Sequence, residues 1–170
     1  MSKNDLENFL NQDREDSQTH VDWLSQRNEW LRHIEAFYDR VLKWLFRYIE
    51  QGKIQVSRRN ITLTEDNIGS YDTEKLILKR ANKEVSLIPI GTVLIGSKGR
   101  IDMRSSAGEV KFVLVEKDST GPSMQNTDAS ENLANSLEWK WKISTSPPSI
   151  QFIELNEESF SDALLEVLNV

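Results

Sequence analysis

The sequence predicts an α+β protein in which a long N-terminal amphipathic helix precedes an antiparallel sheet. Three observations lead to this expectation: residues 19–51 contain no Pro or Gly, about seven later segments alternate apolar and polar residues, and an amphipathic stretch follows Asn156. Because tight turns join consecutive strands, antiparallel pairing is favoured. We therefore expect a curled sheet or a partly open barrel, capped by the C-terminal helix.

The long helix is expected over residues 19–51. Thr19 suits the N-cap, and Gly52 is a natural stop because Gly adopts the left-handed conformation at low cost. A rod of this length, about 48 Å, exceeds the diameter of a domain of this size, so either the helix breaks or one end projects. Its apolar residues recur at the three- and four-residue spacing of one helical face: Trp23, Trp30, Leu31, Ile34, Phe37, Tyr38, Val41, Leu42, Leu45, Tyr48 and Ile49.

The rest of the chain is expected to form one domain with that helix, over residues 19–170. Within the sheet, residues 100–104 and 109–116 give the clearest hairpin signal, and residues 93–95 read as a strand buried on both sides. The expected parts, in order, are a mobile polar lead-in (1–18), the long helix (19–51), the sheet (54–155) with a surface loop (118–136), and the terminal helix (157–168).

The order of the strands and the terminal helix is similar in outline to that of pleckstrin-homology-like barrels, which end in a capping helix. The Trp that this family carries in its capping helix has no counterpart in residues 157–168. The resemblance therefore extends to architecture only.

Composition excludes several kinds of chemistry. The chain has 27 acidic and 21 basic residues, and its net charge of -6 disfavours non-specific binding along nucleic acid. The absence of Cys excludes disulfides, thiolate metal sites and Cys nucleophiles. His20 and His33 lie about 20 Å apart on the expected helix, too far to share a metal ion. With no membrane-spanning run and no apolar secretory core, we expect a cytoplasmic protein that does not bind membranes.

The residue pattern favours a non-catalytic protein-binding module, or an accessory or inhibitory subunit, that needs no cofactor. The apolar arc of the long helix is wider than one packing seam, which indicates burial on two sides. Part of it is therefore expected to contact a protein partner or a second copy of the chain. The expected anchors are Trp23, Trp30, Trp44 and Phe46.

A metal-dependent nuclease is the first alternative. Asp102, Glu109 and Lys111 are spaced D-x6-E-x-K on the expected hairpin, which is similar to the arrangement in restriction-endonuclease-like nucleases. The resemblance implies two carboxylates that hold Mg²⁺ and a Lys that helps to activate water. In this chain the apolar run 112–115 follows the Glu-x-Lys pair, whereas in that family it precedes it. A simple hairpin also places Asp102 opposite Lys111, as an ordinary cross-strand ion pair.

A nucleic-acid or small-ligand binder is the second alternative. Trp139 and Trp141 alternate with Lys140 and Lys142, so an exposed strand face would stack bases while its lysines meet phosphates. Lys98 and Arg100 would supply further cationic contacts. The competing interpretation is a half-buried strand with both Trp side chains inward, and the acidic total makes nucleic acid the less favoured partner.

Overall fold

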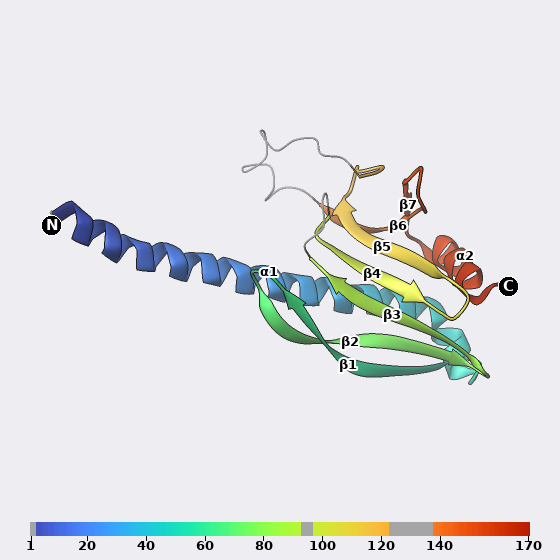
Figure 1. Ribbon diagram of the computed structural model, residues 1–170. Coiled ribbons are helices and arrows are strands. Elements are labelled where there is room, and N and C mark those ends of the chain that lie inside the picture. The colour runs from blue at the N-terminus through green and yellow to red at the C-terminus, as the bar shows by residue number, and fades with distance from the viewer. Residues whose placement is uncertain (1–2, 93–96, 123–137) are drawn as a thin grey trace.

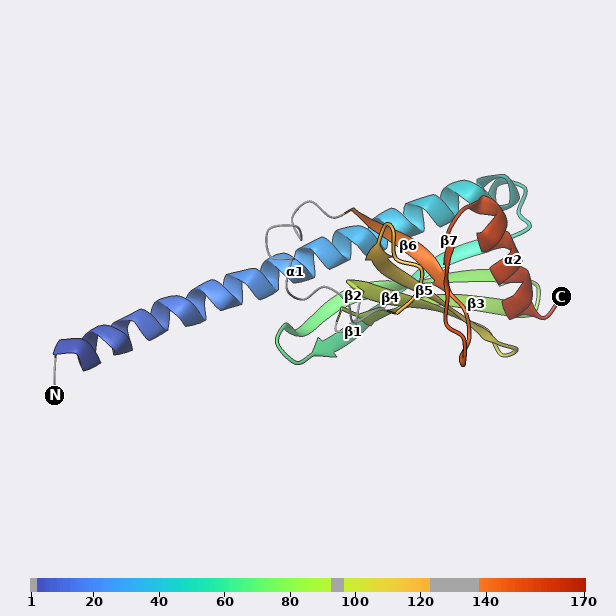
Figure 2. The ribbon, with the colours of Figure 1, turned by 90° about the horizontal axis from the view of Figure 1, so that it is seen from above.

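The computed structural model describes residues 3–92, 97–122 and 138–170, and the side chains of these residues other than 3 and 11–21. The expected α+β class is confirmed, with an antiparallel sheet that curls around one helix (Figures 1 and 2). The elements are α1 (Lys3–Glu50), β1 (Gln55–Glu65), β2 (Gly69–Arg80), β3 (Lys83–Gly91), β4 (Gly99–Arg104), β5 (Glu109–Glu116), β6 (Trp139–Ser144), β7 (Phe152–Glu154) and α2 (Glu157–Leu168).

The seven strands lie in sequence order, each antiparallel to the next. Among the described residues no ladder joins β1 to β7, so the sheet stays open. The β4–β5 hairpin has the expected register, with Asp102 opposite Lys111. β1 is one continuous strand that pairs with β2 along its whole length, from Gln55 opposite Lys79 onward. The strand expected at residues 93–95 falls outside the described part of the chain.

Helix α1 begins at Lys3, well before the expected residue 19, and continues unbroken to Glu50. The polar lead-in joins the helix because propagation from a packed helix costs far less than nucleation. Its 48 residues make a rod of about 72 Å, and the N-terminal part projects beyond the sheet (Figure 1). The stop at Gly52 is confirmed: its φ is +71°, and its N–H donates to the Ile49 carbonyl over 3.0 Å.

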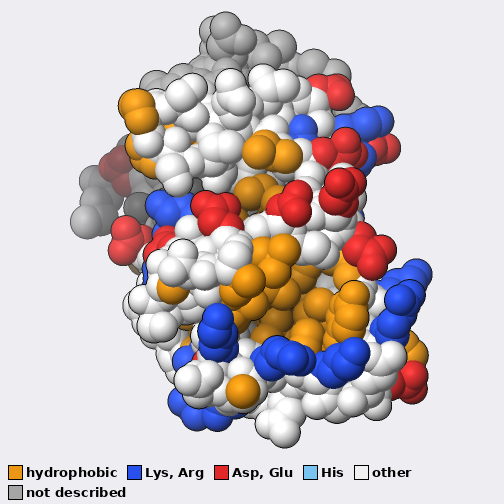
Figure 3. Space-filling view, turned by 90° about the vertical axis from the view of Figure 1, so that its right-hand side faces the viewer, with side chains coloured by type: hydrophobic (Ala, Val, Ile, Leu, Met, Phe, Trp, Pro, Cys, Tyr) orange, Lys and Arg blue, Asp and Glu red, His pale blue; other side chains and the backbone are white. Residues whose placement is uncertain are grey.

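Helix α2 closes one end of the sheet. Asn156 caps it as expected, through a reciprocal pair of hydrogen bonds with Ser159. Its buried stripe packs toward the core and includes Phe160, whose ring lies 5.6 Å from that of Trp44 on α1. Seen from this end in Figure 3, apolar side chains remain visible in a hollow of the surface.

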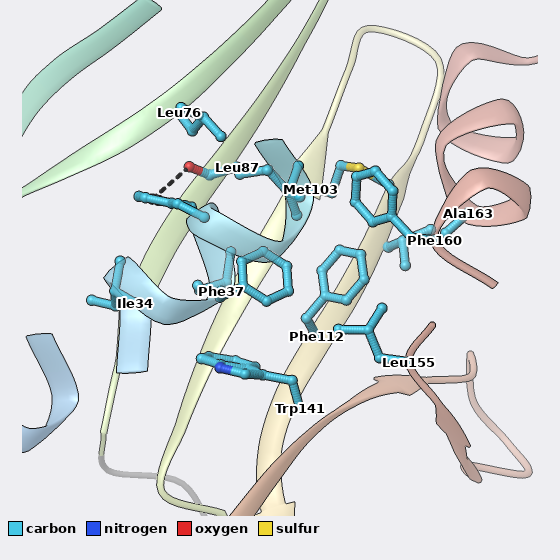
Figure 4. Packing of buried hydrophobic residues seen from close by; sticks show 14 of the residues in the cluster. Ile34, Phe37, Leu76, Leu87, Met103, Phe112, Trp141, Leu155, Phe160 and Ala163 are labelled. Carbon is cyan, nitrogen blue, oxygen red and sulfur yellow. Dashed lines mark hydrogen bonds between the residues drawn. The ribbon is translucent and has the colours of Figure 1, made fainter. Parts of the chain in front are cut away.

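The hydrophobic core lies between α1, α2 and the inner face of the sheet (Figure 4). The ring of Phe37 on α1 lies 5.1 Å from Phe112 on β5 and 5.0 Å from Trp141 on β6. Tyr38 is buried beside it, and its hydroxyl donates to the Glu74 carbonyl over 2.7 Å. This bond satisfies the one polar atom of a side chain that otherwise fills the core.

Gly99, the first residue of β4, allows α1 to approach the sheet closely. A Cβ atom built on Gly99 would lie 2.1 Å from Cζ3 of the Trp30 ring, well inside van der Waals contact. Trp30 is 1% exposed and cannot move aside without disturbing its neighbours in the core. The indole ring therefore requires the absence of a side chain at this position.

We expect Gly99→Ala to lower the free energy of unfolding by about 1–3 kcal/mol, because the added methyl group overpacks the Trp30 site. Urea denaturation followed by Trp fluorescence measures this. Gly108→Ala is the matched control, since the nearest atom to its added Cβ lies 3.9 Å away. If the two variants lost equal amounts of unfolding free energy, the close contact between Trp30 and the β4 backbone would not be the cause of the loss.

Candidate functional site

The projecting part of α1 carries an exposed apolar cluster. Leu6, Phe9 and Leu10 are 62%, 63% and 57% exposed, although such side chains are usually buried. Their i, i+3, i+4 spacing places them together on one face of the helix. The sheet covers only the C-terminal part of α1 (Figure 2), so no described element covers this face. We call these three residues the N-terminal apolar face.

The structure places two of the expected partner anchors against the protein's own core. Trp30 is buried, and its ring lies 5.9 Å from that of Trp141. Trp44 is half-buried, with the Phe160 ring on α2 as one neighbour and the Arg40 guanidinium 5.0 Å from the ring centre as another. Both indoles thus help to hold α1 to the rest of the domain.

The other two expected anchors differ in exposure. Trp23 is half-buried, whereas Phe46 is 58% exposed near the C-terminal end of α1. The N-terminal apolar face was not among the expected anchors. Its signal in the sequence is the spacing of Leu6, Phe9 and Leu10, which carries little weight by itself because one helical turn has no flanking periodicity.

Two of the expected nuclease residues, Asp102 and Glu109, form a ladder of alternating charges with Arg100 and Arg104 on β4 and β5. Asp102 is 0% exposed, and Arg100 Nε lies 2.8 Å from its Oδ1 atom while Arg104 Nη2 lies 2.9 Å from its Oδ2 atom. Arg104 also binds Glu109, with 3.1 Å between Nε and Oε2. Burial raises the pKa of the Asp102 carboxyl, and the two guanidinium groups oppose this. Lys111 is exposed on the neighbouring strand.

Oδ2 of Asp102 accepts hydrogen bonds from Arg100 and Arg104, whereas Oδ1 lies within ion-pair distance of Arg100 Nε without a hydrogen bond. A Mg²⁺ ligand at this position would first have to release two charge-assisted contacts. Among the described residues, no three His, Cys, Asp or Glu side chains gather in a way that would hold a metal ion. The geometry is that of a structural ion-pair network.

We expect Asp102→Ala to cost about 1–3 kcal/mol of unfolding free energy, because it leaves the partly buried Arg100 guanidinium without its counter-charge. Lys111→Ala, which removes an exposed charge from the facing position, is expected to change stability by less than about 0.5 kcal/mol. Chemical denaturation of both variants provides the comparison. If Asp102→Ala left the unfolding free energy unchanged, a structural role for the ladder would be contradicted.

A pocket of about 450 Å³ lies where α1 crosses the ends of β4 and β6. It brings together two of the expected ligand-binding residues: Lys98 Nζ lies 4.9 Å from the ring centre of Trp139. Lys98 also forms an ion pair with Glu29 on α1, with 2.7 Å between Nζ and Oε1. The other two expected residues lie elsewhere, since Arg100 pairs with Asp102 and Trp141 is in the core.

His33 lines this pocket, and its surroundings disfavour the protonated imidazole. Burial lowers its pKa below the usual 6.5, and the positive charges of Lys98 and Arg32 act in the same direction. The Glu29 carboxylate, 3.7 Å from His33 Nε2, opposes the shift without reversing it. The lowered pKa means that the folded protein binds a proton at His33 less readily than the unfolded chain does.

This difference predicts a pH dependence of stability. As the pH falls below 6.5, the unfolded chain takes up a proton at His33 before the folded protein does, so the unfolding free energy falls. We expect His33→Gln to flatten this part of the profile, measured by urea denaturation at several pH values. His20→Gln is the control on the same helix, and an unchanged profile in His33→Gln would contradict the assignment.

Comparisons with protein-family models, with curated proteins and with solved structures found no match to this chain. In the part of the chain that the structure describes, neither helix combines the length and the apolar character needed to cross a membrane.

Proposed function

We propose that this protein is a non-catalytic protein-binding module whose docking element is the projecting N-terminal part of α1. The observation that carries the proposal is the exposure of Leu6, Phe9 and Leu10 on one face of a helix that extends away from the domain (Figure 1). An amphipathic helix with apolar side chains at this spacing is a recurrent ligand for apolar grooves on partner proteins.

The magnitude of the available binding energy supports a weak or moderate interaction. Complete burial of each large apolar side chain yields about 1.5–3 kcal/mol. Three such side chains give a total similar to the free energy that association itself costs, which is about 4 kcal/mol or more. Binding through this face therefore requires additional contacts, and the acidic residues around it, such as Glu7, would supply them against a basic partner.

The two alternatives have less support from the geometry. For the nuclease, the Asp102 carboxylate already lies against the guanidinium groups of Arg100 and Arg104, which Mg²⁺ would have to displace. For the ligand binder, the cationic group of Lys98 is already paired with Glu29 and packed over Trp139. Protein binding gives a role to the exposed N-terminal apolar face of α1, which does not contribute to the core.

The proposal predicts site-specific cross-linking. With a photoreactive phenylalanine analogue in place of Phe9, illumination in the native cellular setting should give a discrete conjugate identifiable by mass spectrometry. The same analogue in place of Asn8, which is exposed on another side of the same helical turn, is the matched control. Leu6→Ser should abolish the conjugate, because it removes one of the three apolar contacts.

Cross-linking of equal yield at positions 8 and 9, or none at either, would contradict docking through this face. Phe46→Ser provides a second control. It removes an exposed apolar side chain from the other end of α1 and should leave the conjugate intact. None of these positions lies in the core, so loss of the fold does not complicate the comparison.

A further inference from the structure

The end of the molecule opposite the N-terminal apolar face has an apolar hollow. Helices α1 and α2 meet where Trp44 packs on Phe160, and α2 then runs to the β4–β5 turn, where Ser105 donates a hydrogen bond to the Val167 carbonyl. Figure 3 shows apolar side chains at the floor of the hollow. The elements at this end contribute partly buried apolar residues: Ile49, Ile54, Val56, Leu164 and Leu168.

One edge of this hollow is basic. Figure 3 shows Lys and Arg side chains along its lower side, whereas acidic side chains lie above it. Arg80 and Lys83 face each other across the β2–β3 hairpin, two residues beyond the buried pair Leu78 and Val85 and therefore on the same face of the sheet. Arg80 also donates to the Lys53 carbonyl over 3.3 Å, which brings the third basic residue alongside. We call Lys53, Arg80 and Lys83 the basic rim.

The basic rim has no internal compensation. Among the residues that the structure describes, no ion pair joins an acidic side chain to Lys53, Arg80 or Lys83, although the protein as a whole is acidic. Two like charges directly opposite each other in a hairpin are destabilising. The rim thus costs stability in the isolated molecule, and an acidic partner would relieve that cost.

The chain itself carries a segment with the matching chemistry. Between Lys3 and Asp16 there are five acidic and two basic residues, around the exposed side chains of Leu6, Phe9 and Leu10. An apolar hollow with a basic edge is complementary to an acidic amphipathic helix in both polarity and charge. The two surfaces therefore fit each other.

They cannot meet within one molecule. Both belong to the same unbroken helix, and at 1.5 Å per residue about 60 Å separates Phe9 from Ile49. Figure 2 shows the N-terminal part of α1 pointing away from the domain and from α2. Contact between the two surfaces thus requires a second copy of the chain.

We propose that the hollow receives the N-terminal part of α1 from a second copy, so that the chain associates head to tail. This inference rests on the proposed role of the N-terminal apolar face in docking. Such a contact uses two different surfaces, so it propagates into an open filament or closes into a ring, depending on the rotation between copies. Added salt should weaken it, because part of the attraction is between exposed charges.

The test uses the full chain and two kinds of variant. Phe9→Glu disables the helix, and Lys53→Glu combined with Lys83→Glu disables the rim. Placing Glu at position 83 opposite Arg80 replaces repulsion with attraction within the hairpin, so this variant should fold at least as well as the parent. Lys117→Glu combined with Lys140→Glu is the matched control, because it reverses two exposed charges that have only weak ion pairs.

Sedimentation velocity over a wide concentration range should show the parent chain and the Lys117/Lys140 control associating. Each disabled variant should associate roughly tenfold or more weakly, and should therefore remain monomeric at concentrations at which the parent associates. A mixture of the Phe9→Glu chain with the rim variant should form a one-to-one dimer that grows no further. The first retains a hollow, the second retains a helix, and only one junction between them is intact.

A parent chain that stays monomeric at every concentration overturns the inference, as does association that survives the rim substitutions. If the parent is a monomer that binds anionic phospholipid vesicles, and the rim variant does not bind them, the hollow is a lipid-binding site instead. If the parent is monomeric yet the position-9 conjugate with another protein persists, head-to-tail association fails and the proposed function stands. If association depends on the rim but not on Phe9, the head-to-tail inference fails, and the cross-linking at position 9 then decides the proposed function by itself.

Discussion

Burial of one face of α1 inside the curled sheet is the contact on which the rest of the structure depends. The sheet is open, so it has no closed interior of its own to pack. Trp30, Phe37 and Tyr38 of α1 fill the space that the curled sheet partly encloses. The sheet supplies the facing rings of Phe112 and Trp141. Without the helix the inner sides of five central strands would face water, at a cost of roughly 25 cal/mol for each Å² of apolar surface.

Polar side chains fix how the sheet curls around this core. The Glu65 carboxylate at the end of β1 accepts hydrogen bonds from the backbone and hydroxyl of Thr92, over 2.7 and 2.6 Å, and from the Tyr71 hydroxyl. Thr92 follows β3, which is not a ladder neighbour of β1, so the carboxylate bridges across β2. Gln26 on α1 donates to the same Thr92 hydroxyl over 3.3 Å. Helix and sheet are therefore fixed to each other by directional bonds as well as by packing.

The length of α1 places the residues that stabilise the fold far from the proposed docking face. Its C-terminal part supplies the core, whereas Leu6, Phe9 and Leu10 lie far from every core residue. The proposed docking face is therefore free to change without loss of stability. A helix supported by tertiary packing at one end also presents such a face with little further ordering on binding, which lowers the entropic cost of association. The same rigidity prevents the chain from covering its own hollow.

The sequence by itself determined the elements and their order. Helical periodicity, strand alternation and turn chemistry are local, so the α+β class, the β4–β5 register, the stop at Gly52 and the Asn156 cap are all found as expected. Only the tertiary structure decided which surfaces remain exposed. The same aromatic pattern put Trp30 in the core and left Phe46 in water, because this choice depends on partners distant in the chain. Asp102 became the centre of an ion-pair ladder for a different reason: the extended conformation of β4 places Arg100 and Arg104, two residues away on either side, on the same face as its carboxylate.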